Sequence, residues 1–191
     1  GLLRPEAERG QARAQYLVGR MYEDGYGVEQ SYAEAARWYK AAAEQGDPLA
    51  QHALSVFYAV GWGVTADPAE SVAWLRRSAQ QGYYYAQNDL GSRYRMGRGV
   101  PQDNGLAYVW LDLAAADAPE SVKGVIAKAR DEVGQTMIDP SRAVEISRMI
   151  NNSGSRLVFD ALHLKVRQYL EDGALEAFAS TRRDYLEKKL E

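Results

Sequence analysis

The sequence has no cysteine and no long apolar run. Without cysteine the chain forms no disulfide, thiolate metal site or cysteine nucleophile, and it suits a reducing or an oxidising compartment equally well. A helix that spans a membrane needs about 20 consecutive apolar residues, so we expect no membrane insertion. The chain also has no excess of positive charge, since 23 basic and 26 acidic residues give a net charge of -3. This balance gives no electrostatic reason to expect a nucleic-acid partner.

Residues arranged for catalysis or metal binding are also sparse. His52 and His163 lack an Asp, Glu or His three or four residues further along the chain, the spacing that makes a helical metal site. No Gly-x-Ser-x-Gly motif is present to make a nucleophile elbow. No pair of carboxylates stands out for general acid and base work. We therefore expect no catalytic residue, no metal site and no cofactor.

A 36-residue repeat dominates what the sequence does contain. A shift of that length brings glycine, alanine, glutamine, tyrosine and tryptophan into register over three units, without insertion or deletion. The aligned positions are Gly10/Gly46/Gly82, Ala14/Ala50/Ala86, Gln15/Gln51/Gln87, Tyr22/Tyr58/Tyr94, Trp38/Trp74/Trp110 and Ala43/Ala79/Ala115. Self-similarity at such a period is typical of a repeat array, in which each unit is one supersecondary element.

Each unit is predicted to hold two helices. The first runs from about Gln11 to Asp24 and has an apolar stripe through Ala14 and Val18, beside a small residue such as Gly19 where a facing helix can approach. Paired glycines with positive backbone angles then reverse the chain. The pairs are Gly25/Gly27, Gly61/Gly63 and Gly97/Gly99, each followed by valine. Because a nucleotide-binding loop needs a strand before its glycines, these pairs are interpreted as structural turns.

The second helix of each unit is predicted to begin after a residue whose side chain caps free amide groups, namely Ser31, Asp67 or Asp103. Pro68 suits the first turn of the second of these helices. The aligned tryptophan then falls in the middle of the helix on its buried face. Alanines next to it allow neighbouring helices to pack closely.

The Gly-x-Gly-Val turn after a tyrosine-bearing helix, followed by tryptophan and an alanine pair, closely resembles the Sel1-like repeat, a relative of the tetratricopeptide repeat. The resemblance covers Gly10 to about Asp117. It implies an all-α fold, a right-handed helical-repeat solenoid of antiparallel helix pairs with a concave groove. Members of the family mostly serve as adaptors and assembly factors. Many bacterial members are exported, which favours the periplasm or another exported location and leaves the cytoplasm open.

The domain boundaries follow from where the repeat weakens. Residues 1–117 are predicted to hold three repeats, and residues 118–150 a degenerate fourth repeat or cap with helices at about 119–133 and 140–150. Residues 151–156 have the composition of a linker or loop. Residues 157–191 are interpreted as additional C-terminal helices in a hairpin. This hairpin either stacks on the fourth repeat, which we favour, or fills the groove as an autoinhibitory or fused ligand-like segment, 157–190.

Candidate contacts are the positions where the repeat fails to repeat, because packing fixes the shared residues and leaves the others free for recognition. The predicted partner-binding residues are Tyr16, Arg20, His52, Val56, Tyr85, Asn88 and Ser92. The tyrosine run 83–85 stands out, since tyrosine is enriched in binding surfaces, although packing between units explains it equally well. The turn residues Tyr26, Trp62 and Arg98 also vary and are weaker candidates.

The leading hypothesis is a protein-interaction adaptor or scaffold that binds a helix or extended peptide of another protein on its concave surface. Its own segment 157–190 is a second possible occupant. One alternative is a hydrolase of the β-lactamase-like kind attributed to some cysteine-rich relatives, whose cysteines this chain lacks. Another is a purely structural module.

Overall fold

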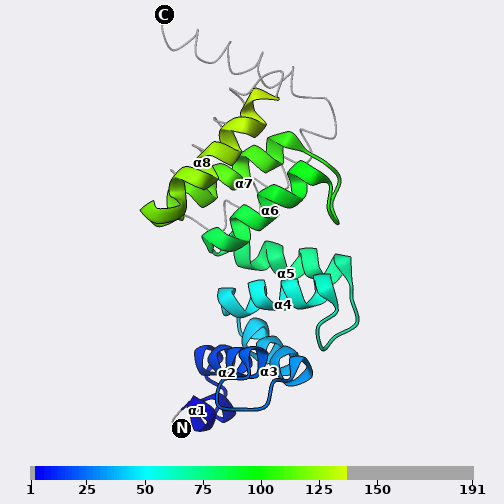
Figure 1. Ribbon diagram of the computed structural model, residues 1–191, viewed down its shortest axis with the longest axis vertical. Coiled ribbons are helices and arrows are strands. Elements are labelled where there is room, and N and C mark those ends of the chain that lie inside the picture. The colour runs from blue at the N-terminus through cyan, green and yellow to red at the C-terminus, as the bar shows by residue number, and fades with distance from the viewer. Residues whose placement is uncertain (1–2, 137–191) are drawn as a thin grey trace, which may run out of the picture. The chain divides into compact units, whose positions relative to one another are not determined.

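The computed structural model describes residues 3–136, which belong to the first of two compact units, Gly1–Arg148. These residues form eight α-helices and no strand (Figure 1). The helices are α1 (Leu3–Glu8), α2 (Ala12–Asp24), α3 (Tyr32–Glu44), α4 (Pro48–Val60), α5 (Pro68–Gln80), α6 (Tyr84–Met96), α7 (Asn104–Asp117) and α8 (Glu120–Gln135). The pairs α2/α3, α4/α5 and α6/α7 are repeats one, two and three, so the predicted all-α solenoid of helix pairs is confirmed.

The ends of the helices follow from single residues. The first helices of the three repeats end at Gly25, Gly61 and Gly97, whose φ angles of 69°, 86° and 67° lie in the left-handed region. Side chains other than glycine rarely adopt this conformation. Ser31 and Asp103 accept hydrogen bonds from amide groups at the starts of α3 and α7. Asp67 does the same for α5, where Pro68 occupies the first turn, so the predicted turns and caps are confirmed.

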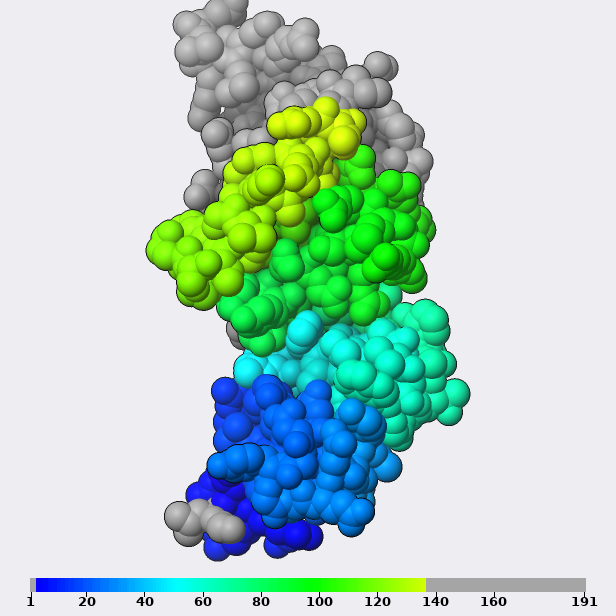
Figure 2. All heavy atoms as spheres, viewed as in Figure 1, coloured from blue at the N-terminus to red at the C-terminus, as the bar shows by residue number. Residues whose placement is uncertain are grey.

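The helices stack in chain order. The main contacts join each helix to the next one along the chain, and Figure 2 shows the colours following one another from blue to yellow-green over the described residues. Small residues bring the paired helices close together, as predicted. A Cβ added to Gly19 would lie 2.6 Å from the Tyr39 ring, and one added to Gly91 would lie 2.8 Å from Leu111 Cγ. These two positions therefore admit only glycine without displacing the facing helix.

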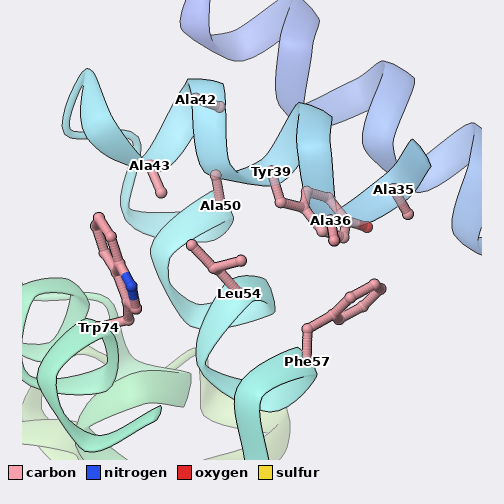
Figure 3. Close-up of a cluster of buried hydrophobic side chains, with 9 residues drawn as sticks. All are labelled: Ala35, Ala36, Tyr39, Ala42, Ala43, Ala50, Leu54, Phe57 and Trp74. Atoms are coloured by element: carbon pink, nitrogen blue, oxygen red, sulfur yellow. The ribbon is translucent and has the colours of Figure 1, made fainter. Parts of the chain in front are cut away.

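The core between repeats one and two combines alanines with a few large side chains (Figure 3). Alanines of α3 and α4 let the backbones approach, while Leu54 and Phe57 of α4 fill the space against Tyr39 of α3. The rings of Tyr39 and Phe57 meet edge to face, with centroids 5.2 Å apart. Trp74 reaches in from α5 toward Ala43, so three consecutive helices share one core.

Buried glutamines tie each repeat to the one before it. Gln15, Gln51 and Gln87 each donate through Nε2 to the backbone carbonyl eight residues earlier, at the end of the preceding helix. The Oε1 atoms of Gln15 and Gln51 accept from the side chains of Gln45 and Gln81 at 2.7 Å. The aligned glutamines seen in the sequence are therefore the hydrogen-bonding groups of the junction between repeats.

Helix α8 lies where the first helix of a degenerate fourth repeat or cap was expected, at about 119–133, and it ends at Thr136 with right-handed backbone angles instead of a left-handed glycine. That these residues form a fourth repeat stays a prediction. The predicted second helix at 140–150, the linker 151–156 and the hairpin 157–191 lie outside the described residues. Those predictions therefore stay untested.

Candidate protein-binding surface

The predicted contact residues lie on the first helices of three successive repeats. We call the outward side of α2, α4 and α6 the first-helix surface. It carries Tyr16 and Arg20 on α2, His52 and Val56 on α4, and Tyr85, Asn88 and Ser92 on α6. Arg20 and Tyr85 are exposed, and the other five are half-buried. None of the seven is buried in the core, so all of them can be reached from solvent at least in part.

Exposed large hydrophobic side chains concentrate on the first helices. Within residues 3–136 they are Tyr26, Val60, Tyr85, Met96 and Val125. All but Tyr26 lie on α4, α6 or α8, and none lies on the second helices α3, α5 and α7. Within the described residues, the second helices therefore expose no large hydrophobic side chain.

The α2 part of the first-helix surface combines an aromatic ring with paired charges. Tyr16 packs against the buried Tyr39, with ring centroids 5.7 Å apart, and the Arg13 guanidinium lies over its ring at 5.1 Å. Arg20 pairs with Asp24 at 3.0 Å, and this hydrogen bond holds the pKa of Arg20 above its usual range. Arg20 therefore stays charged, and its charge is balanced by Asp24.

A buried tyrosine underlies this region. Tyr39 is fully buried and its hydroxyl donates to the Glu23 carboxylate. Burial, followed by this hydrogen bond, raises the pKa of Tyr39 well above its usual range. The Tyr39 phenol is therefore neutral at any ordinary pH and acts as a fixed hydrogen-bond donor.

The N-terminal end of α6 carries a cluster of aromatic rings. Tyr83 contacts His52 of α4 edge to face at 5.5 Å, and Tyr84 and Tyr85 lie 4.2 Å apart. Burial raises the pKa of the Tyr83 phenol. A hydrogen bond with Tyr85 raises the pKa of Tyr84 to about 12. The tyrosine run thus contacts the neighbouring repeat and also presents a ring to solvent, so packing between units is observed and a role in binding stays a prediction.

Further along α6, Asp89 and Arg93 form an ion pair at 3.4 Å. Arg93 also donates to Ser71 Oγ on α5 at 2.9 Å. Burial lowers the pKa of His52, against the opposite effect of Asp89. His52 is therefore predominantly neutral near pH 7, since its ordinary pKa is already about 6.5.

Three serines of the repeat are structural. The side chains of Ser55, Ser71 and Ser78 are fully buried and donate to the backbone carbonyls of His52, Ser55 and Pro48. A serine whose hydroxyl is buried and committed to a backbone carbonyl is not placed to attack a substrate. The three serines are therefore packing residues of the repeat.

The three turn residues differ in their surroundings. Tyr26 is 79% exposed and Arg98 is exposed. Trp62 is instead half-buried, stacked on Tyr32 with centroids 5.0 Å apart and set edge to face against Phe57. The suggestion that Trp62 is an exposed contact is therefore wrong, because its turn packs on the start of α3 and delivers the indole into the core.

Three charged residues of this surface, Arg13, Asp89 and Arg93, were missed in the sequence, although all three lie at variable repeat positions and the same criterion finds them. Asp89 aligns with Leu17 and Ala53, and Arg93 aligns with an equally variable pair, Met21 and Phe57. Arg13 aligns with Leu49 and Tyr85. Its contact with Asp47, at 3.7 Å, is visible only in the structure.

The described residues show no other site. No group of three or more His, Asp or Glu within residues 3–136 is placed to hold a metal ion. Among the described helices, none combines the length and apolar character needed to cross a membrane.

Comparison with known proteins assigns the family. The sequence profile of the Sel1 repeat matches residues 12–47, 48–83 and 85–118, more than half of the chain. The chain belongs to the Sel1 repeat family. Sel1 repeat proteins are generally protein-interaction modules. No curated protein matches this chain.

Two solved structures share the fold. One is c5321, a protective antigen present in uropathogenic Escherichia coli strains that displays an SLR fold, with 44% identity and a TM-score of 0.59 over 61% of this chain. This chain spans only 25% of c5321. The other is a Sel1 repeat protein from Oxalobacter formigenes, with 40% identity and a TM-score of 0.59 over 66% of this chain and 95% of that one. The Sel1 repeats of this chain are therefore similar to bacterial ones.

Proposed function

We propose that this Sel1 repeat chain is an adaptor that binds a segment of another protein on its first-helix surface. The observation that carries the proposal is the concentration of exposed Val60, Tyr85, Met96 and Val125 on first helices, while the second helices expose no large hydrophobic residue in the described range. Exposed apolar surface that is concentrated on particular elements is a common mark of an interaction site. We place the encounter in an exported location, because many bacterial members of this family are exported.

Tyr85 and its neighbours are the proposed centre of the site. Tyr85 offers a large exposed ring on α6, with the half-buried polar side chains of Asn88 and Ser92 beside it. Aromatic residues commonly dominate the energy of protein interfaces, and polar residues around them exclude water and fix orientation. Tyr16, Arg20, His52 and Val56 extend this surface over the two preceding repeats.

Site-specific photocrosslinking with the full chain tests the proposal. A photoreactive phenylalanine at the position of Tyr85 should give a discrete protein adduct in cells. The same group at Arg37 on the second helix α3, where the side chain is 68% exposed, should not. The triple variant Tyr85→Ala, Asn88→Ala and Ser92→Ala should keep the thermal melt and weaken binding of the crosslinked partner at least about tenfold.

Two results would reject the adaptor site. Adducts that form from Arg37 and not from Tyr85 would place the interaction on the second helices. Unchanged affinity in the triple variant would move it away from α6. Turnover of a β-lactam such as nitrocefin by the purified chain is the result expected of the hydrolase alternative, which no contact in the described residues favours.

A further inference from the structure

The chemistry of the partner can be inferred from the tyrosine cluster at the start of α6. Tyr83, Tyr84 and Tyr85 gather three rings within 4.2 to 6.1 Å of one another, and Tyr85 is 49% exposed. The aligned residues of repeats one and two, at 11–13 and 47–49, include no aromatic side chain. Because the other repeats fold without rings at these positions, packing of the repeat does not require them.

The cluster continues across the neighbouring first helices. Tyr83 contacts His52 on α4 at 5.5 Å. Tyr16 on α2 occupies the repeat position that aligns with His52 on α4. We call Tyr16, His52, Tyr83, Tyr84 and Tyr85 the aromatic surface. It spans three repeats and is therefore long enough for a chain segment.

The charges beside the aromatic surface are already paired. Arg13 lies 3.7 Å from Asp47, and Arg20 lies 3.0 Å from Asp24. Asp89 pairs with Arg93 at 3.4 Å. A strongly acidic or basic partner would have to displace these pairs, so the surface fits a segment with little net charge.

The aromatic surface offers hydroxyl donors as well as rings. Tyr84 and Tyr85, whose rings lie 4.2 Å apart, each carry a hydroxyl that can donate one hydrogen bond. Within the described residues, no hydrogen bond occupies the Tyr83 hydroxyl. A matching ligand needs flat apolar groups for the rings and free carbonyl oxygens for the hydroxyls.

We propose that the aromatic surface binds a neutral, proline-rich segment in the polyproline II conformation. Such a segment presents pyrrolidine rings to aromatic side chains, and its carbonyls are unbonded because the polyproline II helix has no internal hydrogen bonds. An α-helical segment bonds its own carbonyls and would leave the tyrosine hydroxyls unused. The inference rests on the proposed adaptor function and adds the chemical class of the partner.

Titration of the full chain with two synthetic peptides tests this inference. One probe is a polyproline dodecapeptide, and the other is a neutral amphipathic helical peptide of equal length. Calorimetry or NMR shifts should show saturable binding of polyproline and at least about tenfold weaker binding of the helical peptide. Tyr85→Ala should weaken polyproline binding by about tenfold or more, as loss of a central aromatic contact does.

Two variants control for structure. Tyr26→Ala removes a more exposed tyrosine outside the aromatic surface and should leave the affinity unchanged. Tyr83→Phe keeps the ring and removes only the hydroxyl donor, so it should weaken binding by a smaller factor than Tyr85→Ala. Circular dichroism shows whether Tyr85→Ala alters the fold. If it does, Tyr83→Phe still tests whether the aromatic surface binds polyproline, because this variant conserves the packing with His52.

The outcomes separate this inference from the adaptor function. No saturable binding of polyproline, or equal loss in Tyr26→Ala and Tyr85→Ala, would overturn the proline-rich ligand. Tighter binding of the helical peptide, abolished by the triple variant at Tyr85, Asn88 and Ser92, would overturn it while supporting the adaptor site. Polyproline binding that survives Tyr83→Phe and Tyr85→Ala unchanged would also overturn it.

Discussion

Two turn glycines, Gly27 and Gly63, share a backbone conformation and differ in their surroundings. Their φ angles are 72° and 65°. A Cβ added to Gly63 would overlap the backbone carbonyl of Tyr32, whereas one added to Gly27 would meet only Met21 Cε at 3.9 Å. The turn of repeat two thus packs directly on the start of α3.

This pair allows conformational strain to be separated from steric overlap. Gly27→Ala should lower the free energy of unfolding by about 1 kcal/mol, the cost of a left-handed alanine. Gly63→Ala should cost at least about twice as much, because the Tyr32 carbonyl must also move. Urea denaturation of both variants measures the difference, and equal losses would show that the turn does not rest on α3.

Trp74 is the large side chain that joins the core of repeats one and two. It is 7% exposed, and Arg77 lies over its ring at 4.3 Å. Trp74→Ala should lower the free energy of unfolding by about 3 to 5 kcal/mol, as truncation of large buried aromatics does. Tyr26→Ala is the matched exposed control and should change it by less than about 0.5 kcal/mol. An unchanged thermal melt in Trp74→Ala would show that the indole does not hold the repeats together.

At the scale of the elements, the glutamine contacts are incomplete in repeat three. Asp117 stands where Gln45 and Gln81 stand in the other repeats. Its carboxylate has no amide hydrogen to donate, and the buried Oε1 of Gln87 has no hydrogen-bond partner in the described residues. Gln87 instead donates to Asp117 Oδ2 at 3.4 Å. An unsatisfied buried acceptor costs free energy, so the junction formed by Gln87 is weaker than those formed by Gln15 and Gln51.

Asp117→Gln should repair this junction. The new amide can donate to Gln87 Oε1, as Gln81 donates to Gln51 at 2.7 Å, and should raise the free energy of unfolding by about 1 kcal/mol. Asp117→Asn removes the same charge but is one methylene shorter. If both variants stabilise the chain equally, the gain comes from removing a negative charge at the end of α7, and the hydrogen-bond explanation fails.

The helices and turns could be predicted from the sequence because each depends on one or two residue types. Aspartate at the repeat position of Asp67 caps a helix, and glycine at the repeat position of Gly61 ends one. The position of Trp62 could not be predicted, because its burial depends on which turn packs on which helix. The same holds for the candidate site: Tyr85 was found as a variable residue, whereas the pairing of Arg13 with Asp47 depends on distances between helices.

At the scale of the whole molecule, the described helices form a one-dimensional stack. The main contacts join consecutive helices, and no large contact skips a helix in residues 3–136. In such a stack, stability is approximately a sum over repeats and the junctions between neighbours. Substitutions at one junction should therefore leave the distant junctions intact.

Duplication of repeat two tests this additivity. When residues 48–83 are copied after Tyr83, the only new junction places α5 against a second α4. That helix offers Ala50 and Leu54 where α6 natively offers Ala86 and Leu90, so the packing is conserved. The added 36 residues should raise the unfolding enthalpy by about 25 kcal/mol, at about 0.7 kcal/mol per residue, in a single cooperative transition seen by calorimetry.

Duplication of residues 48–65 alone is the control for register. It copies α4 and its turn without α5, so one first helix directly follows another. The apolar stripe of the first of these helices then packs against a first helix instead of a second helix. This variant should melt at a lower temperature than the parent chain. A separate second transition for the inserted full repeat would contradict the nearest-neighbour account, because a correctly packed copy gains a junction on both sides and should unfold together with its neighbours.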